Sequence, residues 1–138
     1  MGLALAVRSV EVRDARDLDV AFEAIAREHP EALVLADPFT LGQRARIVEF
    51  VAEHRVPEIY ENGDFVEAGG LMSYGPNVSD LFRRAATYVD KILRGAKPAD
   101  LPIEQPTKFE LVLNMRAANA LGISFPASVR LRADRVIE

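Results

Sequence analysis

The stretch FVEAGGLMSYGPNVSDLFRRAATYVDKILRGAKPADLPIEQPTKFELVLNMRAANALG, residues 65–122, decides the fold of this chain. After an acidic loop it predicts an apolar strand at residues 70–74 and then a long amphipathic helix. A connector with three prolines follows at residues 96–107. The stretch closes with a predicted strand at 109–113 and a predicted short helix at 115–121. No catalytic motif is visible in it.

The ends of both predicted helices are marked by residue type. Asn77 or Ser79 can cap the long helix, because a side-chain oxygen there can accept a hydrogen bond from the first turn. We expect Gly95 to end this helix and Gly122 to end the short one, since glycine tolerates the left-handed backbone of a helix C-terminus. From Pro126 onward we expect an irregular tail.

Upstream of this stretch the pattern alternates between strand and helix. Residues 8–13 alternate apolar and polar and predict a strand, and residues 18–26 recur at helical spacing. The apolar run at residues 32–36 predicts a parallel strand covered on both faces. Thr40 is expected to cap a second helix, and residues 58–60 to form the next strand. This order predicts an α/β fold with parallel strands, right-handed crossovers and helices on the faces of the sheet.

Composition narrows the class of protein. The chain has 138 residues, 49% of them hydrophobic and 28% charged, so it is one domain or part of one and can bury a core. A net charge of −4 argues against nucleic acid or an anionic membrane as the main partner. Cysteine is absent, which excludes disulfides and thiolate chemistry. No apolar run is long enough to insert into a membrane.

The end of the strand at 32–36 is the first candidate for a ligand site. Ligands of open α/β sheets bind at the carboxyl ends of the strands. Phe39 offers a face for stacking, and Asp37 can accept a hydrogen bond from a ligand ammonium group, with Thr40 beside them. The competing interpretation is that Asp37 and Thr40 only cap the following helix.

The end of the strand at 58–60 is the second candidate. The carboxylates of Glu61 and Asp64 could hold an amino group, and backbone N–H groups around Asn62 could hold a carboxylate. The competing interpretation is a solvated turn at residues 62–64.

Other chemistry finds little support in the sequence. His29 and His54 each lie near the end of a predicted helix, and no further ligands accompany them, so we expect no metal site. Ser73, Ser124 and Ser128 lack the surroundings of an exposed nucleophile. No phosphate-binding loop or dinucleotide fingerprint is present. The sequence therefore predicts a protein that is not an enzyme and that needs no cofactor.

The chain resembles the substrate-binding proteins of ABC transporters, in the group that includes tryptophan-binding members. The resemblance rests on EAGGLMSYGPN, DLFRRAA, GAKPADLP and EQPTKFELV in this order and spacing, and on LADPFTLGQRARI and VPEIY. It implies an α/β protein, an incomplete three-layer Rossmann-like lobe of the type I periplasmic-binding-protein fold. Only the carboxyl-terminal half of the family's length is covered.

The resemblance also implies an organisation. Residues 1–76 would form part of the second lobe, residues 77–108 a helix and connector that belong to the first lobe, and residues 109–138 the return strand, short helix and tail. Ser73, Tyr74 and Gly75 would lie at the hinge between the lobes.

The resemblance further implies partners and a location. The implied partners are a small organic solute such as an amino acid and an ABC permease, and the implied location is the periplasm. The sequence shows no signal peptide at its start, so a complete chain of this sequence would stay in the cytoplasm. Incomplete lobes should leave apolar surface exposed, which predicts a homodimer or a domain swap.

Two alternatives remain beside a solute-binding function. The chain could be a truncated remnant that folds and binds nothing. Alternatively, the residues VLADP resemble the phosphoacceptor strand end of a receiver domain, with Asp37 as the acceptor. A receiver also needs an acidic pair after its first strand and a lysine after its last, and Lys108 is poorly placed for that role.

Overall fold

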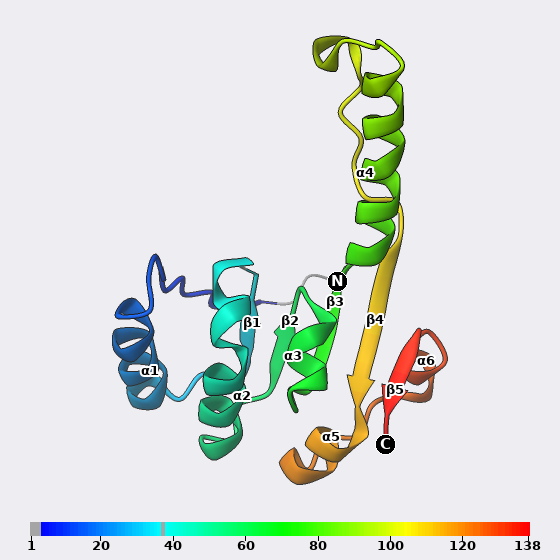
Figure 1. Cartoon of the computed structure of the whole chain (residues 1–138). Coiled ribbons are helices and arrows are strands. Elements are labelled where there is room, and N and C mark those ends of the chain that lie inside the picture. Colours follow the sequence, from blue (N-terminus) through cyan, green and yellow to red (C-terminus); the bar gives the residue numbers. More distant parts are fainter. Residues whose placement is uncertain (1–3, 37) are drawn as a thin grey trace.

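A five-stranded sheet organises the structure, which is a computed structural model that describes residues 4–36 and 38–138 (Figure 1). Strands β1, β2 and β3 are parallel to one another, β4 is antiparallel to β3, and β5 is parallel to β4. The parallel start confirms what the alternation of strand and helix predicts. In sheet order the strands are β1 (Leu33–Leu35), β2 (Glu58–Tyr60), β3 (Met72–Pro76), β4 (Phe109–Asn114) and β5 (Arg135–Ile137).

Helices connect the strands along the chain (Figure 1). Two short 3₁₀ helices lie in loops, η1 (Pro38–Gln43) before α2 and η2 (Pro98–Asp100) after α4. The α-helices are α1 (Asp17–Glu28), α2 (Arg44–Glu53), α3 (Gly63–Glu67), α4 (Val78–Leu93), α5 (Met115–Leu121) and α6 (Ala127–Arg130).

One face of the sheet is covered by helices from β1 to β4. Leu35, Tyr60, Ser73 and Val112 are paired in register across β1 to β4 and share this face. α2 and α3 lie over it, and Tyr60, Ser73 and Val112 are each only 1% exposed. The core here also contains Leu18, Ile47, Val48 and Phe65. Burial of these side chains supplies the main driving force for folding of this half of the protein.

The opposite face is covered only in part. Val34, Ile59, Met72 and Leu113 are paired in register on this face. Leu113 is 0% exposed in a second core with Ala118 of α5, whereas Val34 is 74% exposed. The prediction that the strand at 32–36 is covered on both faces was wrong, because none of the helices in the described residues packs over Val34. The three-layer α/β architecture is confirmed, with its second helical layer over β3 to β5 alone.

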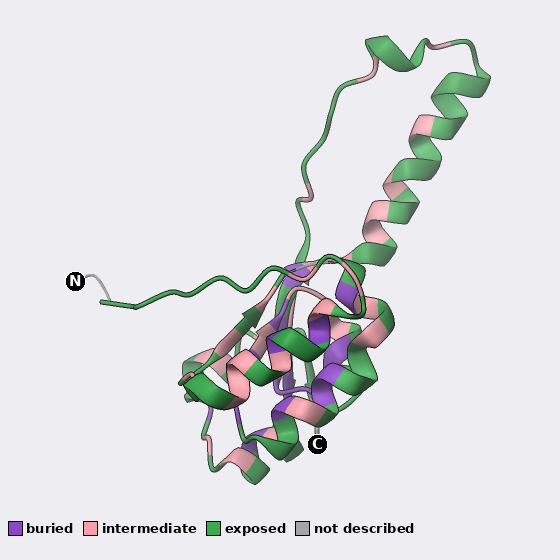
Figure 2. Ribbon diagram, turned by 90° about the vertical axis from the view of Figure 1, so that its left-hand side faces the viewer, coloured by how far each residue is buried: buried purple, intermediate pink, exposed green. Residues whose placement is uncertain are grey.

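The arm, defined here as residues 77–108, projects from this body. α4 rises away from the sheet, and the connector runs back alongside it to β4 (Figure 1). Buried residues are confined to the body, while the arm is exposed or partly exposed (Figure 2). Asn77 caps α4 by accepting a hydrogen bond of 2.7 Å from the Asp80 N–H, and Gly95 follows the helix with a φ of 100°. Both features confirm the sequence analysis.

The connector is fixed along α4 by polar contacts. The Tyr88 hydroxyl donates to the Pro102 carbonyl at 2.7 Å. The Arg84 guanidinium donates to the Thr107 hydroxyl at 3.2 Å and forms an ion pair with Glu104. The arm is therefore a two-layered hairpin of helix and extended chain.

Two predicted elements were wrong at the ends of the chain. Residues 8–13 form no strand, because no strand in the described residues lies beside them, and only Val12 packs partly against the first core. The tail after Pro126 is not irregular. It forms α6 and then β5, and the Asp134 carboxylate accepts a 2.8 Å hydrogen bond from the Leu111 N–H of β4.

Two predictions about helix starts were also wrong. Thr40 does not cap α2, because it lies within η1 and is 2% exposed, and α2 begins only at Arg44. Residues 62–64 are not a free turn. The Asn62 side chain caps α3 by accepting from the Asp64 N–H at 2.8 Å.

Candidate functional site

The carboxyl ends of β1 and β2 lie side by side and place the two predicted loops together. Leu35 and Tyr60 are paired in register at these ends. The Glu61 N–H donates to the Leu35 carbonyl at 3.2 Å. The loops that follow β1 and β2 therefore begin next to each other at one edge of the sheet. This is the part of a parallel sheet where ligands are expected to bind.

The loop after β1 contributes an aromatic ring. Phe39 is 46% exposed in η1, which leaves one part of the ring at the surface. Thr40 is buried, so its hydroxyl belongs to the interior rather than to a ligand surface. Asp37, the third predicted residue of this loop, lies outside the described residues.

The loop after β2 splits into two environments. Glu61 is partly exposed directly beyond the strand end, and the Oδ1 of Asn62 is occupied by its capping bond to α3. Asp64 is exposed on α3 and borders a shallow groove toward the start of α2. The groove has a volume of about 720 Å³ and is lined by Gly42, Arg44, Ala45, Asp64, Glu67 and Ala68. Asp64 therefore belongs to this groove, whereas Glu61 lies directly beyond the strand end.

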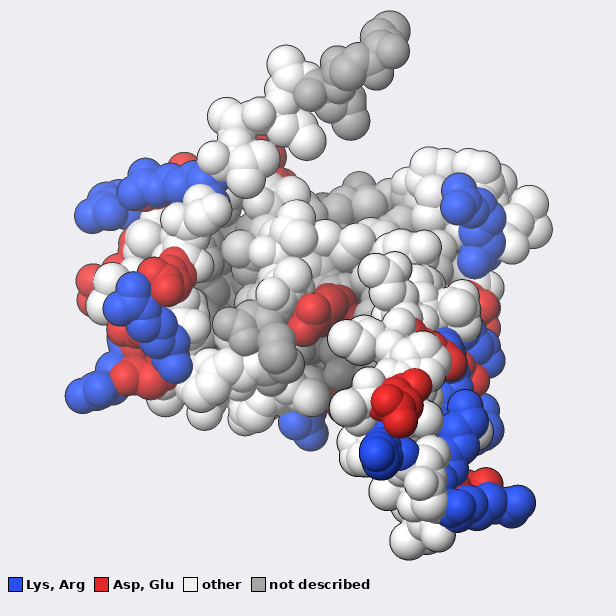
Figure 3. Space-filling model, turned by 90° about the horizontal axis from the view of Figure 1, so that it is seen from above, with Lys and Arg blue, Asp and Glu red and all other residues white. Residues whose placement is uncertain are grey.

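Seen from above, the molecule carries acidic side chains near the middle of its upper face, with uncharged side chains among their described neighbours (Figure 3). Basic side chains gather instead on the arm and at the outer rim (Figure 3). This upper face suits a small ligand with a positively charged group, because an ammonium group would meet carboxylates there.

A close backbone approach fixes the loop after β2. Gly75 of β3 lies against the Glu61 carbonyl, and a Cβ atom added at Gly75 would fall 1.7 Å from that oxygen. Only glycine fits at this position. The backbone of Glu61 is thus held directly against β3.

The three predicted hinge residues lie within the paired part of β3. Ser73 is buried, Gly75 packs against the loop after β2, and Tyr74 is exposed with its ring stacked on Phe109 at 5.7 Å. The chain leaves the sheet only after Pro76 and returns at Phe109, and these two residues form the last pair of the β3–β4 ladder.

Sequence reasoning missed a polar contact at the exit of the arm. The Asn77 Nδ2 donates to the Glu110 carboxylate, and the Asn77 N–H donates to the Lys108 carbonyl at 2.9 Å. One residue therefore joins the start of α4 to the start of β4. Its role as a helix cap was predictable from sequence, whereas the partner 33 residues away was not.

Buried polar groups below the site serve the fold. The Glu58 carboxylate accepts a 2.8 Å hydrogen bond from the Leu71 N–H, and burial raises the pKa of Glu58. Burial also raises the pKa of Tyr60, with the nearby Glu58 carboxylate adding to the shift. The Tyr60 ring stacks on Phe65 at 4.4 Å. Neither group reaches the strand-end surface, so neither is placed to act on a ligand.

The two histidines lie at the C-terminal ends of helices α1 and α2. His29 ends α1 in the left-handed conformation with a φ of 46°, and His54 contacts the Phe50 carbonyl at 2.9 Å through Nδ1. Within residues 4–36 and 38–138, no group of three His, Asp or Glu side chains is arranged to hold a metal ion. Among the helices described, none has the length and apolar character needed to cross a bilayer.

Comparison with known proteins agrees with this architecture. The family model described as ABC transporter substrate binding protein matches residues 2–137. No curated protein matches the chain. A solved ABC domain from Streptococcus pneumoniae in complex with L-Trp is 26% identical, with a TM-score of 0.88 over 96% of this chain and 46% of that one.

Two further solved structures are similar. A conserved domain protein from Vibrio cholerae O1 biovar El Tor is 28% identical, with a TM-score of 0.80 over 88% of this chain and 41% of that one. A ligand-free, open substrate-binding protein with adhesive properties from Clostridium difficile shares the fold at 19% identity and a TM-score of 0.60, over 91% and 42%. The chain thus spans less than half the length of the solved structures it matches.

Proposed function

Because the chain belongs to the ABC transporter substrate-binding protein family, we propose that it supplies the carboxyl-terminal part of a solute receptor. This family consists of binding proteins rather than enzymes. The observation that carries the proposal is the edge at the ends of β1 and β2, where the loops that contain Phe39 and Glu61 begin side by side. The two-lobed arrangement of such a receptor would place the arm with the first lobe.

The solute that we propose is a small amino acid or a related organic molecule. Phe39 would stack on an apolar or aromatic side chain, and Glu61 would accept a hydrogen bond from an ammonium group. Asp37, Asn62 and Asp64 stay secondary candidates. The L-Trp-bound relative supports this class of ligand without identifying the one bound here. The proposed partner is an ABC permease, and the proposed location is the periplasm.

The hinge would lie where the arm joins the body. Ser73 and Gly75 are packed inside the body, so we propose that rotation occurs beyond them, between Pro76 and Asn77 and between Lys108 and Phe109. Tyr74 would move with the body. Loop and strand ends are the usual places at which such rotation is absorbed.

The sequence offers a direct binding assay. The chain contains no tryptophan, so the fluorescence of added L-tryptophan can be followed without a tryptophan signal from the protein. Thermal-shift measurements with the other amino acids and small organic acids extend the test. A ligand at 100 times its dissociation constant should stabilise the folded state by about 2.7 kcal/mol.

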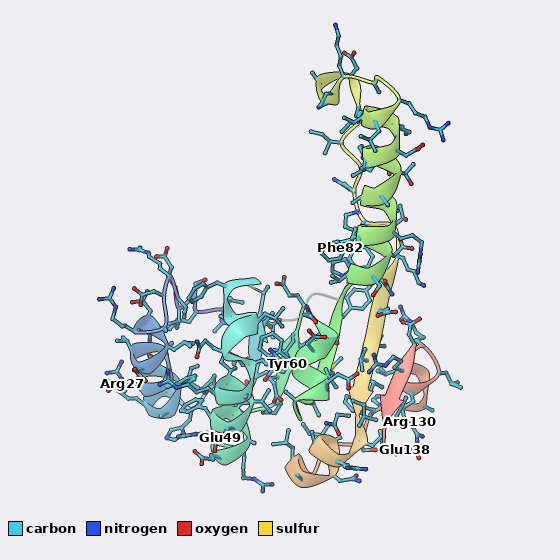
Figure 4. The ribbon with its side chains drawn as sticks, in the orientation of Figure 1. Arg27, Glu49, Tyr60, Phe82, Arg130 and Glu138 are labelled. Carbon is cyan, nitrogen blue, oxygen red and sulfur yellow. The ribbon has the colours of Figure 1, made fainter. Side chains whose placement is uncertain are left out.

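Variants locate the site. We expect Phe39→Ala and Glu61→Gln each to weaken binding by about tenfold, since each removes one interaction worth roughly 1.4 kcal/mol. Glu49→Gln is the matched control, because Glu49 is an exposed carboxylate on α2 well away from the strand ends (Figure 4). A folded protein that responds to no compound in the panel would contradict the proposal and support a remnant that does not bind solutes.

A further inference from the structure

The arm is joined to the body at one end only. It rises from the sheet between β3 and β4, and none of its residues, 77–108, is buried (Figure 1). Packing against the body therefore does little to fix the orientation of the arm. The contacts that fix it lie where the chain crosses between body and arm, from Pro76 to Asn77 and from Lys108 to Phe109.

Asn77 makes three polar contacts at this crossing. Its Oδ1 accepts the 2.7 Å capping bond from the Asp80 N–H, which ties the side chain to α4. Its N–H donates to the Lys108 carbonyl at 2.9 Å, and this bond joins one crossing peptide to the other. Its Nδ2 donates to the carboxylate of Glu110, the second residue of β4. Of the three contacts, only the one with Glu110 joins the arm to the body.

We propose that this Asn77–Glu110 hydrogen bond, called the latch here, holds the arm in its present orientation and breaks when the arm rotates against the body. The proposal takes the hinge of the proposed function as its premise. Rotation at the two crossings carries the Asn77 side chain along with α4, because the capping bond belongs to the helix, and it leaves Glu110 in the sheet. Asn77 is therefore a positioning residue for the arm.

The surroundings of the latch favour its formation. Glu110 is partly buried, and its carboxylate forms no ion pair with another described residue. The Asp80 carboxylate is paired with Arg83 at 3.3 Å, so it does not draw the Asn77 amide away. A hydrogen bond to an ionised acceptor is stronger than one between neutral groups. The loss of this bond should therefore change the arm's orientation measurably.

The other side-chain bonds of the arm stay within it. Arg84 reaches the connector through Glu104 and Thr107, and Tyr88 reaches it through Pro102. Within residues 4–36 and 38–138, the latch is the one side-chain hydrogen bond or ion pair that links residues 77–108 to the body. The helix and its connector therefore rotate as one piece, and the latch is the side-chain contact that opposes the rotation.

The latch ends beside the candidate ligand site. Glu110 is paired in register with Gly75, and Gly75 lies against the backbone of Glu61. One residue pair of the sheet therefore separates the latch from the loop that follows β2. The orientation of the arm is set at the same edge of the sheet at which the solute is proposed to bind.

The test measures the orientation of the arm without any solute. The chain has no cysteine, so Glu49→Cys on α2 and Thr87→Cys on α4 introduce one pair of spin labels at exposed positions of body and arm. Pulsed double electron–electron resonance then gives the distribution of distances between the labels. With Asn77 and Glu110 intact, we expect a single narrow distribution.

Asn77→Asp removes the latch and keeps the cap. Aspartate is as good a capping residue as asparagine, but it puts a second carboxylate in front of Glu110 in place of the amide donor. We expect the population of arm orientations outside the wild-type distribution to rise about tenfold. Glu110→Gln added to Asn77→Asp restores a donor and an acceptor with their roles exchanged, so the double variant should return to the narrow distribution.

The outcomes separate the latch from a general effect on the fold. Asn119→Asp makes the same change of charge at an exposed position of α5 and should leave the distribution as it is. Circular dichroism confirms that each variant keeps its helices. A broad distribution in the wild type, a narrow one in Asn77→Asp, or a double variant as broad as Asn77→Asp would overturn the latch.

Solute binding is scored separately, in the L-tryptophan titration and the thermal-shift panel. If the variants shift the arm as expected and no compound binds, the proposed solute function fails and the latch stands. If a compound binds and Asn77→Asp leaves the arm unchanged, the latch fails and the solute function stands.

Discussion

Replacing Gly75 by alanine should damage both the stability of the body and the geometry of the ligand site. The added Cβ would lie 1.7 Å from the Glu61 carbonyl oxygen and 2.7 Å from its carbonyl carbon. Real Cβ contacts stay above 3.0 Å, so one of the two backbones must move by at least 3.0 − 1.7 = 1.3 Å. Both belong to the sheet or its immediate continuation, and neither can yield as a flexible side chain would.

The expected cost follows from that displacement. Overpacking of a rigid interior costs about 1–3 kcal/mol, and a weakened ladder hydrogen bond adds roughly 1 kcal/mol. We therefore expect Gly75→Ala to lower the free energy of unfolding by about 3 kcal/mol, which corresponds to a fall in Tm of about 10 °C. Urea unfolding followed by circular dichroism measures the change.

Gly42→Ala is the matched control for this substitution. A Cβ atom at Gly42 would meet no atom within 4 Å. We expect it to leave the free energy of unfolding within about 0.5 kcal/mol, or to raise it slightly by restricting the unfolded chain. If Gly75→Ala unfolds at the same urea concentration as wild type, the close approach of β3 to the loop after β2 is not as described.

Three further substitutions probe buried polar groups. Glu58→Gln should raise Tm at pH 7 and leave it unchanged near pH 4. Because folding raises the pKa of Glu58, the stability that its protonated form contributes is lost as pH rises. Glutamine carries no charge and can still accept a hydrogen bond from the Leu71 N–H. Tyr60→Phe should change the free energy of unfolding by no more than about 1 kcal/mol in urea titrations, since the buried Tyr60 hydroxyl makes no hydrogen bond of good geometry in the described structure and the nearby Glu58 carboxylate already accepts from the Leu71 N–H. Asn114→Ala should lower it by about 1 kcal/mol, because Asn114 caps α5 through two N–H groups, whereas Asn119→Ala, exposed on the same helix, should not.

Elements with strong local signals were predicted almost to the residue. The strand at 58–60 and the helix at 115–121 match β2 and α5, and Asn77, Gly95 and Gly122 mark helix ends as expected. Caps and left-handed residues act within one turn of the chain, so a short window of sequence contains all that determines them.

Elements that depend on distant neighbours were not predictable. The alternation at residues 8–13 suits a strand, but a strand needs a partner, and none lies beside it in the described structure. β5 shows the converse. Its three residues carry no strand pattern, and they form a strand because β4 lies beside them. Val34 shows the same limit, since an apolar run does not reveal whether both faces of its strand are covered.

The arrangement of the two predicted loops followed from the sequence, whereas the surroundings of their side chains did not. The pairing of β1 with β2 brings the two predicted loops together, as the order of elements implied. Burial of Thr40 and the capping role of Asn62 follow from packing and hydrogen bonds that composition does not report. Phe39 and Glu61 are the predicted residues whose exposure fits contact with a ligand.

The arm leaves and re-enters the body through neighbouring backbone positions. Pro76 pairs with Phe109, and the Asn77 N–H to Lys108 carbonyl bond closes the ladder just as a hairpin turn would. Residues 78–107 are therefore joined to the body only at their two ends, like a loop between two paired strands. A tight turn in place of residues 78–107 would therefore leave the register of β3 and β4 unchanged, so the body can be engineered separately from the arm.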